Sequence, residues 1–236
     1  MLRFKPLKDD HVIYFIHIPK TGGSSFNNLL VKIYGHRHLF HADDSVRLGK
    51  KSINELDTHK KSQIKVITSH ARFDFAKSLL PDKEIIAITL IRDPIQRVKS
   101  QINYIYTTPK HTLHRQVKEI FDQNLDLNQL FKNNLNFNNL QCFMLSGESS
   151  AEKAISSVSK NIKLIGSTDR YNEFVQQCSS ILGWQTKGLH LNEKVNKSLI
   201  SLDLDESLIL EYNQEDQRLF DWHKKNKHAK CSQIHN

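Results

Sequence analysis

A short polar segment near the start of the chain has the composition of a phosphate-binding loop. Residues 17–25 have the sequence HIPKTGGSS and directly follow an apolar run at residues 12–16. A turn from a strand into a helix leaves backbone N–H groups without partners, and the helix dipole favours an anion there. Two glycines let the backbone approach a ligand closely, a lysine adds a positive charge, and three hydroxyl groups add donors. These residues are Lys20, Thr21, Gly22, Gly23, Ser24 and Ser25.

The position of the lysine distinguishes this segment from the phosphate loop of ATPases and kinases. That loop places its lysine after the glycines, in the order GK[ST], whereas Lys20 precedes Gly22 and Gly23. The spacing therefore argues against a P-loop ATPase or kinase. The simplest structural alternative is a strand-to-helix turn with a serine N-cap and a surface lysine.

A second candidate phosphate anchor follows another apolar run, at residues 85–91, where the chain continues as RDPIQRVKS. Arg92 comes at the end of this predicted strand, and its guanidinium can bind phosphate through two parallel hydrogen bonds. The next proline suits the first turn of a helix. The alternative for Arg92 is a structural ion pair at a helix start. Further along that helix, we expect Arg97 to pair with Asp93 across one turn.

Together the two segments resemble the sulfotransferases that modify carbohydrates, the family that includes heparan sulfate 2-O-sulfotransferase. In that family a loop similar to residues 17–25 holds the 5′-phosphosulfate of 3′-phosphoadenosine 5′-phosphosulfate (PAPS), the sulfuryl donor. The sequence also resembles the family's RDP-x-x-R-x-x-S pattern. The resemblance implies that Arg92 and Ser100 bind the 3′-phosphate of PAPS, in a P-loop-like domain that needs no metal for its reaction.

His70 is the candidate general base, because it follows a predicted strand at residues 64–68. In similar carbohydrate sulfotransferases a histidine at this strand end is the base. An imidazole can take a hydroxyl proton near neutral pH, and Lys20 can neutralise the charge that develops on the leaving phosphate oxygen. A polar residue that merely closes a strand is the alternative for His70. His17 is the competing histidine, and its counterparts in the family look structural.

Two basic segments are candidates for the acceptor wall, residues 36–41 (HRHLFH) and residues 110–118 (KHTLHRQVK). In glycosaminoglycan sulfotransferases the corresponding regions contact acidic sugar. The resemblance implies that Lys110, His114 and Arg115 meet a carboxylate or sulfate of the acceptor. A solvated helix face explains these three residues equally well.

Looser resemblances to the family extend over most of the chain. They cover residues 138–143 (NNLQCF), residues 164–171 (LIGSTDRY) and residues 191–198 (LNEKVNKS), the last of which is similar to the loop that covers the nucleotide. These segments do not locate the adenine pocket. Ser167 and Lys197 are the candidates for adenine contacts.

The elements that must position these residues follow from the hydrophobic pattern. Apolar runs predict strands at residues 12–16, 64–68, 85–91 and 162–165. The predicted helices are 25–34, 95–106, 112–124, 127–133, 137–145, 150–159, 171–183 and 205–225. Strands that alternate with helices predict an α/β fold with a central parallel sheet of about four to five strands and helices on both faces. Such a sheet binds ligands at the carboxyl ends of its strands, where the candidate residues lie.

Composition limits the remaining alternatives. The chain has 236 residues, which suits one domain over residues 1–236. Its three cysteines show no metal-binding spacing and indicate reduced thiols, so we expect a cytoplasmic protein, with Cys142 and Cys178 in the core. The first ten residues do not resemble a signal peptide, and no apolar run is long enough to span a bilayer.

The sequence therefore predicts a PAPS-dependent sulfotransferase that acts on an anionic or neutral carbohydrate. The formal net charge of +9 also suits a non-catalytic nucleotide-binding or nucleic-acid-binding protein. A nucleic-acid-binding protein would not explain two phosphate anchors at strand ends, so we expect no nucleic-acid partner. A P-loop-type nucleotide kinase remains the alternative enzyme.

Overall fold

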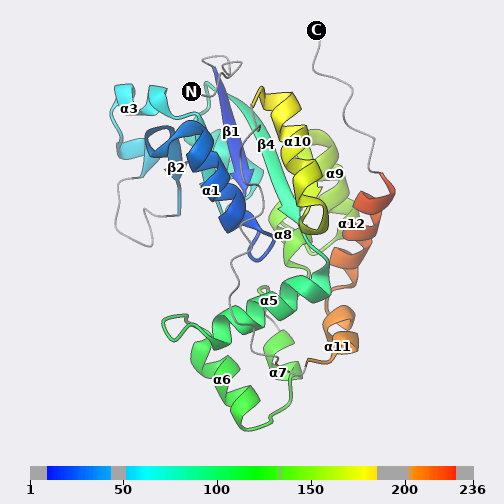
Figure 1. Cartoon of the computed structure of the whole chain (residues 1–236). Helices are drawn as coiled ribbons and strands as arrows, with labels where there is room; N and C mark the ends of the chain where they lie inside the picture. The colour runs from blue at the N-terminus through cyan, green and yellow to red at the C-terminus, as the bar shows by residue number, and fades with distance from the viewer. Residues whose placement is uncertain (1–9, 44–51, 133, 185–201, 203, 227–236) are drawn as a thin grey trace.

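The computed structural model describes residues 10–43, 52–132, 134–184, 202 and 204–226, and it is built around a five-stranded sheet (Figure 1). Each pair of neighbouring strands is parallel, and the strand order is β2-β3-β1-β4-β5. The strands are β1 His11–Ile16, β2 Leu39–His41, β3 Val66–Ser69, β4 Glu84–Ile91 and β5 Ile162–Ser167. Because the strands are parallel, their carboxyl ends meet at one edge of the sheet.

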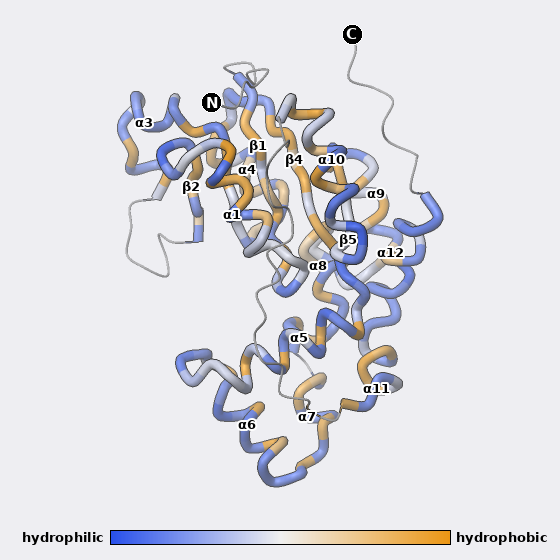
Figure 2. The backbone as a smooth tube through the Cα atoms, viewed as in Figure 1, coloured by the Kyte–Doolittle hydropathy of each residue, from blue (hydrophilic) through white to orange (hydrophobic). Residues whose placement is uncertain are grey.

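β1 is the middle strand and lies at the centre of the hydrophobic core. Its residues 12–16 are completely buried, and it pairs with β3 on one side and with β4 on the other. A parallel strand that is covered on both faces consists of nearly continuous apolar residues. Figure 2 shows β1 and β4 as hydrophobic segments in the interior of the fold.

Helices cover both faces of the sheet, and the residues of β1 alternate between two cores. Ile13 and Phe15 pack with α1 and α10, whereas Val12, Tyr14 and Ile16 pack with α4, α8, α9 and α12. These helices are α1 Gly23–Tyr34, α4 Phe73–Leu79, α8 Leu140–Ser146, α9 Ala151–Asn161, α10 Tyr171–Leu182 and α12 Gln214–Lys225.

A further group of helices lies beyond the carboxyl ends of the strands, in the lower part of Figure 1. α5 follows β4 directly, and its apolar side packs with α6, α7 and α11 in a separate hydrophobic core. These helices are α5 Pro94–Tyr106, α6 His114–Asp122, α7 Asn128–Phe131 and α11 Glu206–Glu211. The edge of the sheet where ligands are expected is therefore next to a helical wall.

The predicted fold class is confirmed: the chain has a parallel sheet of five strands with helices on both faces. Sequence analysis missed β2, because it has only three residues within a basic segment. It also missed α4 and the exposed helix α3 Thr58–Gln63, which has no buried residue to give a periodic pattern. The helix predicted at 205–225 is two helices, α11 and α12, which Tyr212 and Asn213 separate.

Cys142 and Cys178 are buried in the core, as predicted, and both are free cysteines. Burial is the main cause that raises the pKa of both thiols above the usual value. Cys231 lies outside the described residues. In the part of the chain that the structure describes, no helix has the length and apolar character needed to cross a membrane.

Candidate active site

The predicted phosphate loop connects β1 to α1, and its backbone forms a tight turn. Lys20 and Gly22 both have positive φ angles, of 69° and 83°. A left-handed backbone costs a residue other than glycine about 1–2 kcal/mol, so the loop holds Lys20 in a strained conformation. The buried Thr21 hydroxyl donates to the Ile18 carbonyl at 2.8 Å. The Thr21 side chain therefore stabilises the turn itself.

The amino terminus of α1 is arranged to receive an anion. No side chain of the described residues caps it, and its first turn contains no acidic residue. The first N–H groups of a helix lack intrahelical acceptors, and the helix dipole favours negative charge beside them. Ser24 and Ser25 lie in this first turn, the former exposed and the latter half-buried. Together these groups form a donor arrangement of the kind that suits a phosphate at a helix start.

The two glycines of the loop meet different constraints: Gly23 makes room for a neighbouring side chain, whereas Gly22 has a positive φ that other residues rarely adopt. A Cβ atom on Gly23 would lie 1.9 Å from the His17 ring, so this ring packs directly on the backbone. A Cβ atom on Gly22 would lie 3.5 Å from Thr168, whose hydroxyl donates to the Ile91 carbonyl at 3.1 Å. The loop is therefore packed against residues that follow β1 and β5.

His70, the predicted base, follows β3, and its exposed ring reaches back to the phosphate loop. The ring atom Nδ1 lies 2.6 Å from the His17 carbonyl oxygen. A carbonyl only accepts, so Nδ1 carries the proton, and Nε2 holds the lone pair of the neutral ring. Asp43 accepts from the His70 backbone N–H and from the Ser69 hydroxyl, each at 2.9 Å. These contacts fix the tautomer and the backbone position of His70, with Nε2 as its basic atom.

His17 is a neutral histidine behind His70. The two ring centroids are 4.5 Å apart, and the other side of His17 stacks on Phe15 at 5.6 Å. Burial is the main cause that lowers the pKa of His17 to about 3, with further contributions from His70, His41 and Lys20. His17 is therefore uncharged near neutral pH and unsuited to accept a proton there. The structural role expected for it agrees with this burial.

The Lys20 side chain lies over an aromatic ring that the sequence analysis did not assign. Its Nζ is 4.3 Å from the centroid of the Tyr104 ring, which is partly exposed on α5. Attraction between an ammonium group and a ring face contributes about 0.5–2 kcal/mol. Tyr104 lies one helical turn beyond the half-buried Ser100 on α5. This four-residue spacing from a predicted phosphate ligand is the sequence signal that could have pointed to Tyr104. Its ring also meets His111 edge-on at 5.8 Å.

Arg92 lies directly after β4 and connects the two predicted phosphate anchors. Its Nη1 donates to the Lys20 carbonyl at 3.2 Å. The side-chain amide of Gln141 accepts from the Arg92 N–H at 2.8 Å and donates to the Arg92 carbonyl at 2.9 Å. Burial lowers the pKa of Arg92 while Asp93 opposes this change, and a guanidinium remains charged in proteins. Gln141 belongs to the NNLQCF segment, to which the sequence analysis gave no role.

The expected pair between Arg97 and Asp93 is wrong. The Asp93 carboxylate instead caps α5, where it accepts from the Gln96 N–H at 3.0 Å. Arg97 lies on the buried face of α5, and its Nη1 donates to the Asn136 carbonyl at 3.0 Å. Burial lowers the pKa of Arg97 to about 10, an effect that the nearby Asp216 partly offsets. Helix periodicity, which turns Arg97 into the core, explains why it does not meet Asp93.

The three predicted acceptor residues lie on the helical wall. Lys110 is exposed between α5 and α6, and His114 begins α6 with its Nδ1 2.9 Å from the Ile105 carbonyl. Arg115 is exposed and forms an ion pair with Glu119 at 3.0 Å. The contact between Tyr104 and His111 holds the loop between α5 and α6, which carries Lys110 and leads into His114 and Arg115, near Lys20.

Ser167, a candidate adenine contact, ends β5 and lies opposite Ile91 of β4. Its hydroxyl oxygen is buried and has no hydrogen-bond partner among the described residues. A small cavity of about 60 Å³ is lined by Ser167 and by residues of α10. Lys197 and residues 191–198 lie outside the described residues.

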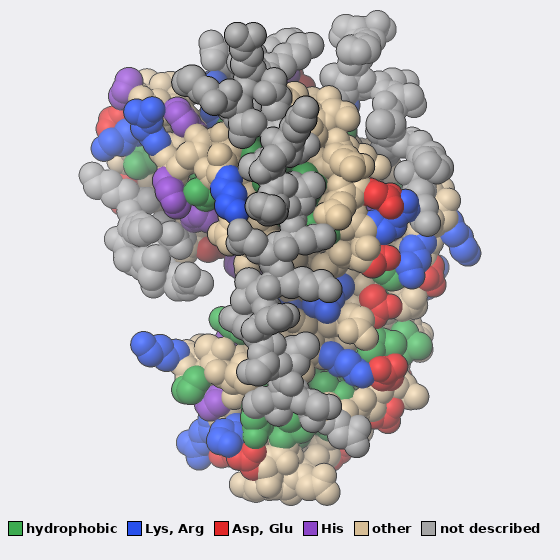
Figure 3. All heavy atoms as spheres, in the orientation of Figure 1, with side chains coloured by type: hydrophobic (Ala, Val, Ile, Leu, Met, Phe, Trp, Pro, Cys, Tyr) green, Lys and Arg blue, Asp and Glu red, His purple; other side chains and the backbone are tan. Residues whose placement is uncertain are grey.

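The space-filling view shows a hollow between the part of the molecule built on the sheet and the helices below it (Figure 3). Histidine side chains gather on its upper side, and a lysine or arginine side chain projects from its lower side. The two predicted acceptor segments belong to these two parts, since residues 36–41 include β2 and residues 110–118 lead into α6.

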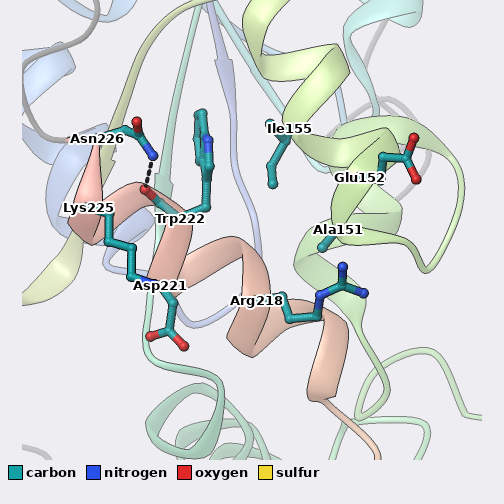
Figure 4. Close-up of a pocket in the computed structure, with 8 residues that line it drawn as sticks. All are labelled: Ala151, Glu152, Ile155, Arg218, Asp221, Trp222, Lys225 and Asn226. Atoms are coloured by element: carbon teal, nitrogen blue, oxygen red, sulfur yellow. Dashed lines mark hydrogen bonds between the residues drawn. The ribbon is translucent and has the colours of Figure 1, made fainter.

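Two other features lie outside this constellation. A cavity of about 500 Å³ between α9 and α12 is lined by residues that include Trp222, Ile155 and Arg218, and no predicted site residue lines it (Figure 4). Asp10, His11 and Glu84 have their potential metal-ligand atoms within 4.8 Å of one another. They lie at the amino ends of β1 and β4, the opposite edge of the sheet from His70 and Arg92.

The model of the Sulfotransferase family matches residues 7–235, which is nearly the whole chain. The chain belongs to the sulfotransferase family. Membership indicates a transferase that moves a sulfuryl group, in agreement with the predicted reaction type. The similarity to the carbohydrate-modifying enzymes in particular stays a prediction.

Solved structures of other sulfotransferases are similar to this family member at low identity. A mouse sulfotransferase complexed with PAP is 14% identical, with 94% of this chain and 86% of that chain covered and a TM-score of 0.41. A sulfotransferase from Alicyclobacillus acidocaldarius is 14% identical, with 89% and 94% covered and a TM-score of 0.49. The search of curated proteins found no match.

Proposed function

We propose that this family member transfers the sulfuryl group of PAPS to a hydroxyl group of a carbohydrate, with His70 as the general base. The observation that carries the proposal is the contact between the two phosphate anchors, in which the Arg92 guanidinium donates to the Lys20 carbonyl at 3.2 Å. PAPS carries phosphate groups on both the 5′ and the 3′ positions of one nucleoside. Two joined anchors suit such a ligand better than a nucleotide with a single phosphate chain.

The residues present fit this donor, which supplies an activated sulfuryl group on its 5′-phosphate. The uncapped start of α1, with Gly22 and Gly23 before it and Ser24 and Ser25 within it, suits the 5′ side. On the 3′ side, the candidates are Arg92 and Ser100. For the nucleoside, the buried Ser167 hydroxyl without a partner among the described residues is a candidate.

The proposed mechanism assigns one task to each reactive side chain. Nε2 of His70 takes the acceptor's hydroxyl proton as the hydroxyl oxygen forms its bond to sulfur. The bond between sulfur and the phosphate oxygen breaks, and its electron pair stays on the phosphate. Lys20, whose Nζ lies over the Tyr104 ring, neutralises this charge on the phosphate oxygen. Protonated His70 then returns its proton to water from its exposed position.

The acceptor site is proposed in the hollow between the sheet and the helical wall. The side chains of Lys110, His114 and Arg115 on one side, and residues 36–41 on the other, supply positive or titratable groups for a carboxylate or sulfate. Such groups suit an acidic carbohydrate. A cytoplasmic location is part of the proposal and is supported by the two buried, free cysteines.

The donor assignment is tested by thermal unfolding with adenosine 3′,5′-bisphosphate, ATP or a DNA duplex. A ligand at 100 times its Kd stabilises the folded protein by about 2.7 kcal/mol, so binding is visible as a higher Tm. We expect the bisphosphate to raise the Tm and ATP and DNA to leave it unchanged. No shift with the bisphosphate, or an equal shift with ATP, would contradict the proposal.

The acceptor assignment is tested by transfer from PAPS labelled in its sulfuryl group. The panel contains an acidic polysaccharide, its uncharged counterpart and small non-carbohydrate alcohols. We expect label in carbohydrate, and transfer confined to the small alcohols would contradict the acceptor class while leaving the donor assignment intact.

A further inference from the structure

Gln141 binds both backbone polar groups of Arg92 with one side chain. Its Oε1 accepts from the Arg92 N–H at 2.8 Å, and its Nε2 donates to the Arg92 carbonyl at 2.9 Å. Gln141 is completely buried. A side-chain amide that satisfies both groups of one residue replaces the next step of a β-ladder at the point where β4 has ended. The peptide groups on either side of the Arg92 Cα atom are therefore held in fixed directions.

The backbone of Gln141 is itself held in place by a buried carboxylate. Asp216 of α12 accepts from the Gln141 N–H at 3.1 Å and from the Cys142 N–H at 2.8 Å. Asp216 is completely buried, and burial is the main cause that raises its pKa. The buried guanidinium of Arg97 is the nearby positive charge that opposes this rise. Hydrogen bonds between buried polar groups in a low-dielectric interior give the bonded groups little freedom to move.

Arg92 is also in contact with the phosphate loop, so the orientation of its side chain affects both phosphate anchors. Its Nη1 donates to the Lys20 carbonyl at 3.2 Å, and Lys20 is the loop residue with the strained φ of 69°. A shift of the Arg92 backbone would move both the guanidinium and its support of this peptide group.

We propose that Gln141 is a positioning residue for recognition of the donor's 3′-phosphate, because it sets the direction in which Arg92 presents its guanidinium. This inference rests on the proposed function. It assigns to Gln141 no contact with the donor. The effect of Gln141 on binding passes through Arg92 and is larger for ligands that carry a 3′-phosphate than for ligands that lack it.

The test compares the Kd of adenosine 3′,5′-bisphosphate with the Kd of adenosine 5′-monophosphate, which lacks the 3′-phosphate. Gln141→Met keeps the length of the side chain and removes both hydrogen bonds. We expect it to reduce the preference for the bisphosphate by about tenfold, the effect of weakening one charged hydrogen bond. Leu145→Ala is the matched control, because Leu145 is a buried residue of the same helix that does not contact Arg92 through a described hydrogen bond. It should lower the Tm and keep the preference.

A double-mutant cycle separates positioning from general loosening of the fold. In an Arg92→Ala background, Gln141→Met should leave the remaining preference unchanged, because the residue through which Gln141 acts is gone. An equal loss in both backgrounds, or an unchanged preference in the single variant, would overturn the inference. If Gln141→Met does not fold, Gln141→Asn carries the same expectation, since its shorter amide cannot reach both groups. A wild-type protein that binds neither nucleotide would instead contradict the proposed function.

Discussion

The rings of His70 and His17 lie side by side, but their different exposure suits them to different roles. His70 is exposed and donates through Nδ1, whereas His17 packs on the backbone of Gly23 and has a pKa lowered to about 3. The His17 carbonyl accepts a hydrogen bond from Nδ1 of His70, so the half-buried histidine orients the exposed one through its backbone. The sequence places both histidines at strand ends as possible general bases, and their different burial distinguishes the two.

The general-base role proposed for His70 predicts that its substitution affects catalysis and leaves nucleotide binding intact. His70→Ala should reduce kcat by about 10²–10⁴-fold, the usual contribution of a general base, while binding of adenosine 3′,5′-bisphosphate stays as in the wild type. Arg92→Ala should show the opposite order, with nucleotide binding lost first. Transfer assays and calorimetric titration measure the two quantities. Loss of nucleotide binding in His70→Ala would mean that His70 is structural.

The low pKa of His17 predicts a dependence of stability on acid. Below its ordinary pKa of 6.5 the unfolded chain binds a proton at His17 that the folded protein does not bind until pH falls to about 3. The free energy of unfolding should therefore decrease as pH falls from 6.5 to 3, because the unfolded state binds more protons. His17→Phe should reduce this slope in urea titrations at several pH values. His36→Phe, at an exposed histidine, is the control, and a slope unchanged by His17→Phe would contradict the assignment.

At the scale of elements, α8 and α12 cap each other. The Asn139 side chain accepts from the N–H groups of Glu215 and Asp216 at 3.0 and 3.1 Å, at the start of α12. Asp216 in turn accepts from two N–H groups at the start of α8. Each helix therefore supplies hydrogen-bond acceptors for the first N–H groups of the other helix, which lack acceptors within their own helix.

This reciprocal capping predicts a large effect for a small substitution. Asn139 has a φ of 44°, so Asn139→Ala loses a cap and places alanine in a left-handed backbone. We expect the free energy of unfolding to fall by about 2 kcal/mol, with roughly half from each cause. Asn139→Gly should cost less, because glycine accepts positive φ. Urea unfolding measures both, and equal losses in the two variants would remove the backbone contribution.

The sequence predicted those elements whose burial imposes a pattern. β1, β4, α1 and α5 were found because both faces of a strand, or one face of a helix, are apolar. β2 was missed because three residues are too few to show an alternating hydrophobic pattern. The pairing of Arg97 was predicted wrongly because Arg97 lies on the buried face of α5, although its charge suggested an exposed ion pair. Lys20, His70 and Arg92 were placed by their positions after strands. Gln141, Asp43 and Tyr104 act through contacts between distant segments, which local sequence does not reveal.

At the scale of the whole molecule, the formal net charge of +9 acts on anything anionic that approaches. The Debye length is about 10 Å at 0.1 M salt, so added salt weakens attraction across the hollow. We expect the KM for an acidic polysaccharide to rise several-fold between 0.05 and 0.3 M NaCl (roughly doubling the screening). An uncharged acceptor, measured with saturating donor at the same salt concentrations, is the control. An equal rise for both acceptors would show that salt acts on the donor or the fold.

The capping of α8 by α12 also has a consequence for biosynthesis. Gln141 is 49 positions after Arg92, and Asp216 is a further 75 positions after Gln141. A ribosome adds about 5–20 residues per second, so Arg92 is made roughly 6–25 seconds before the carboxylate that secures its support. A nascent chain can therefore complete the sheet long before it can bind its donor firmly. We therefore expect firm donor binding to require α12, so products that end before α12 should not sequester the nucleotide.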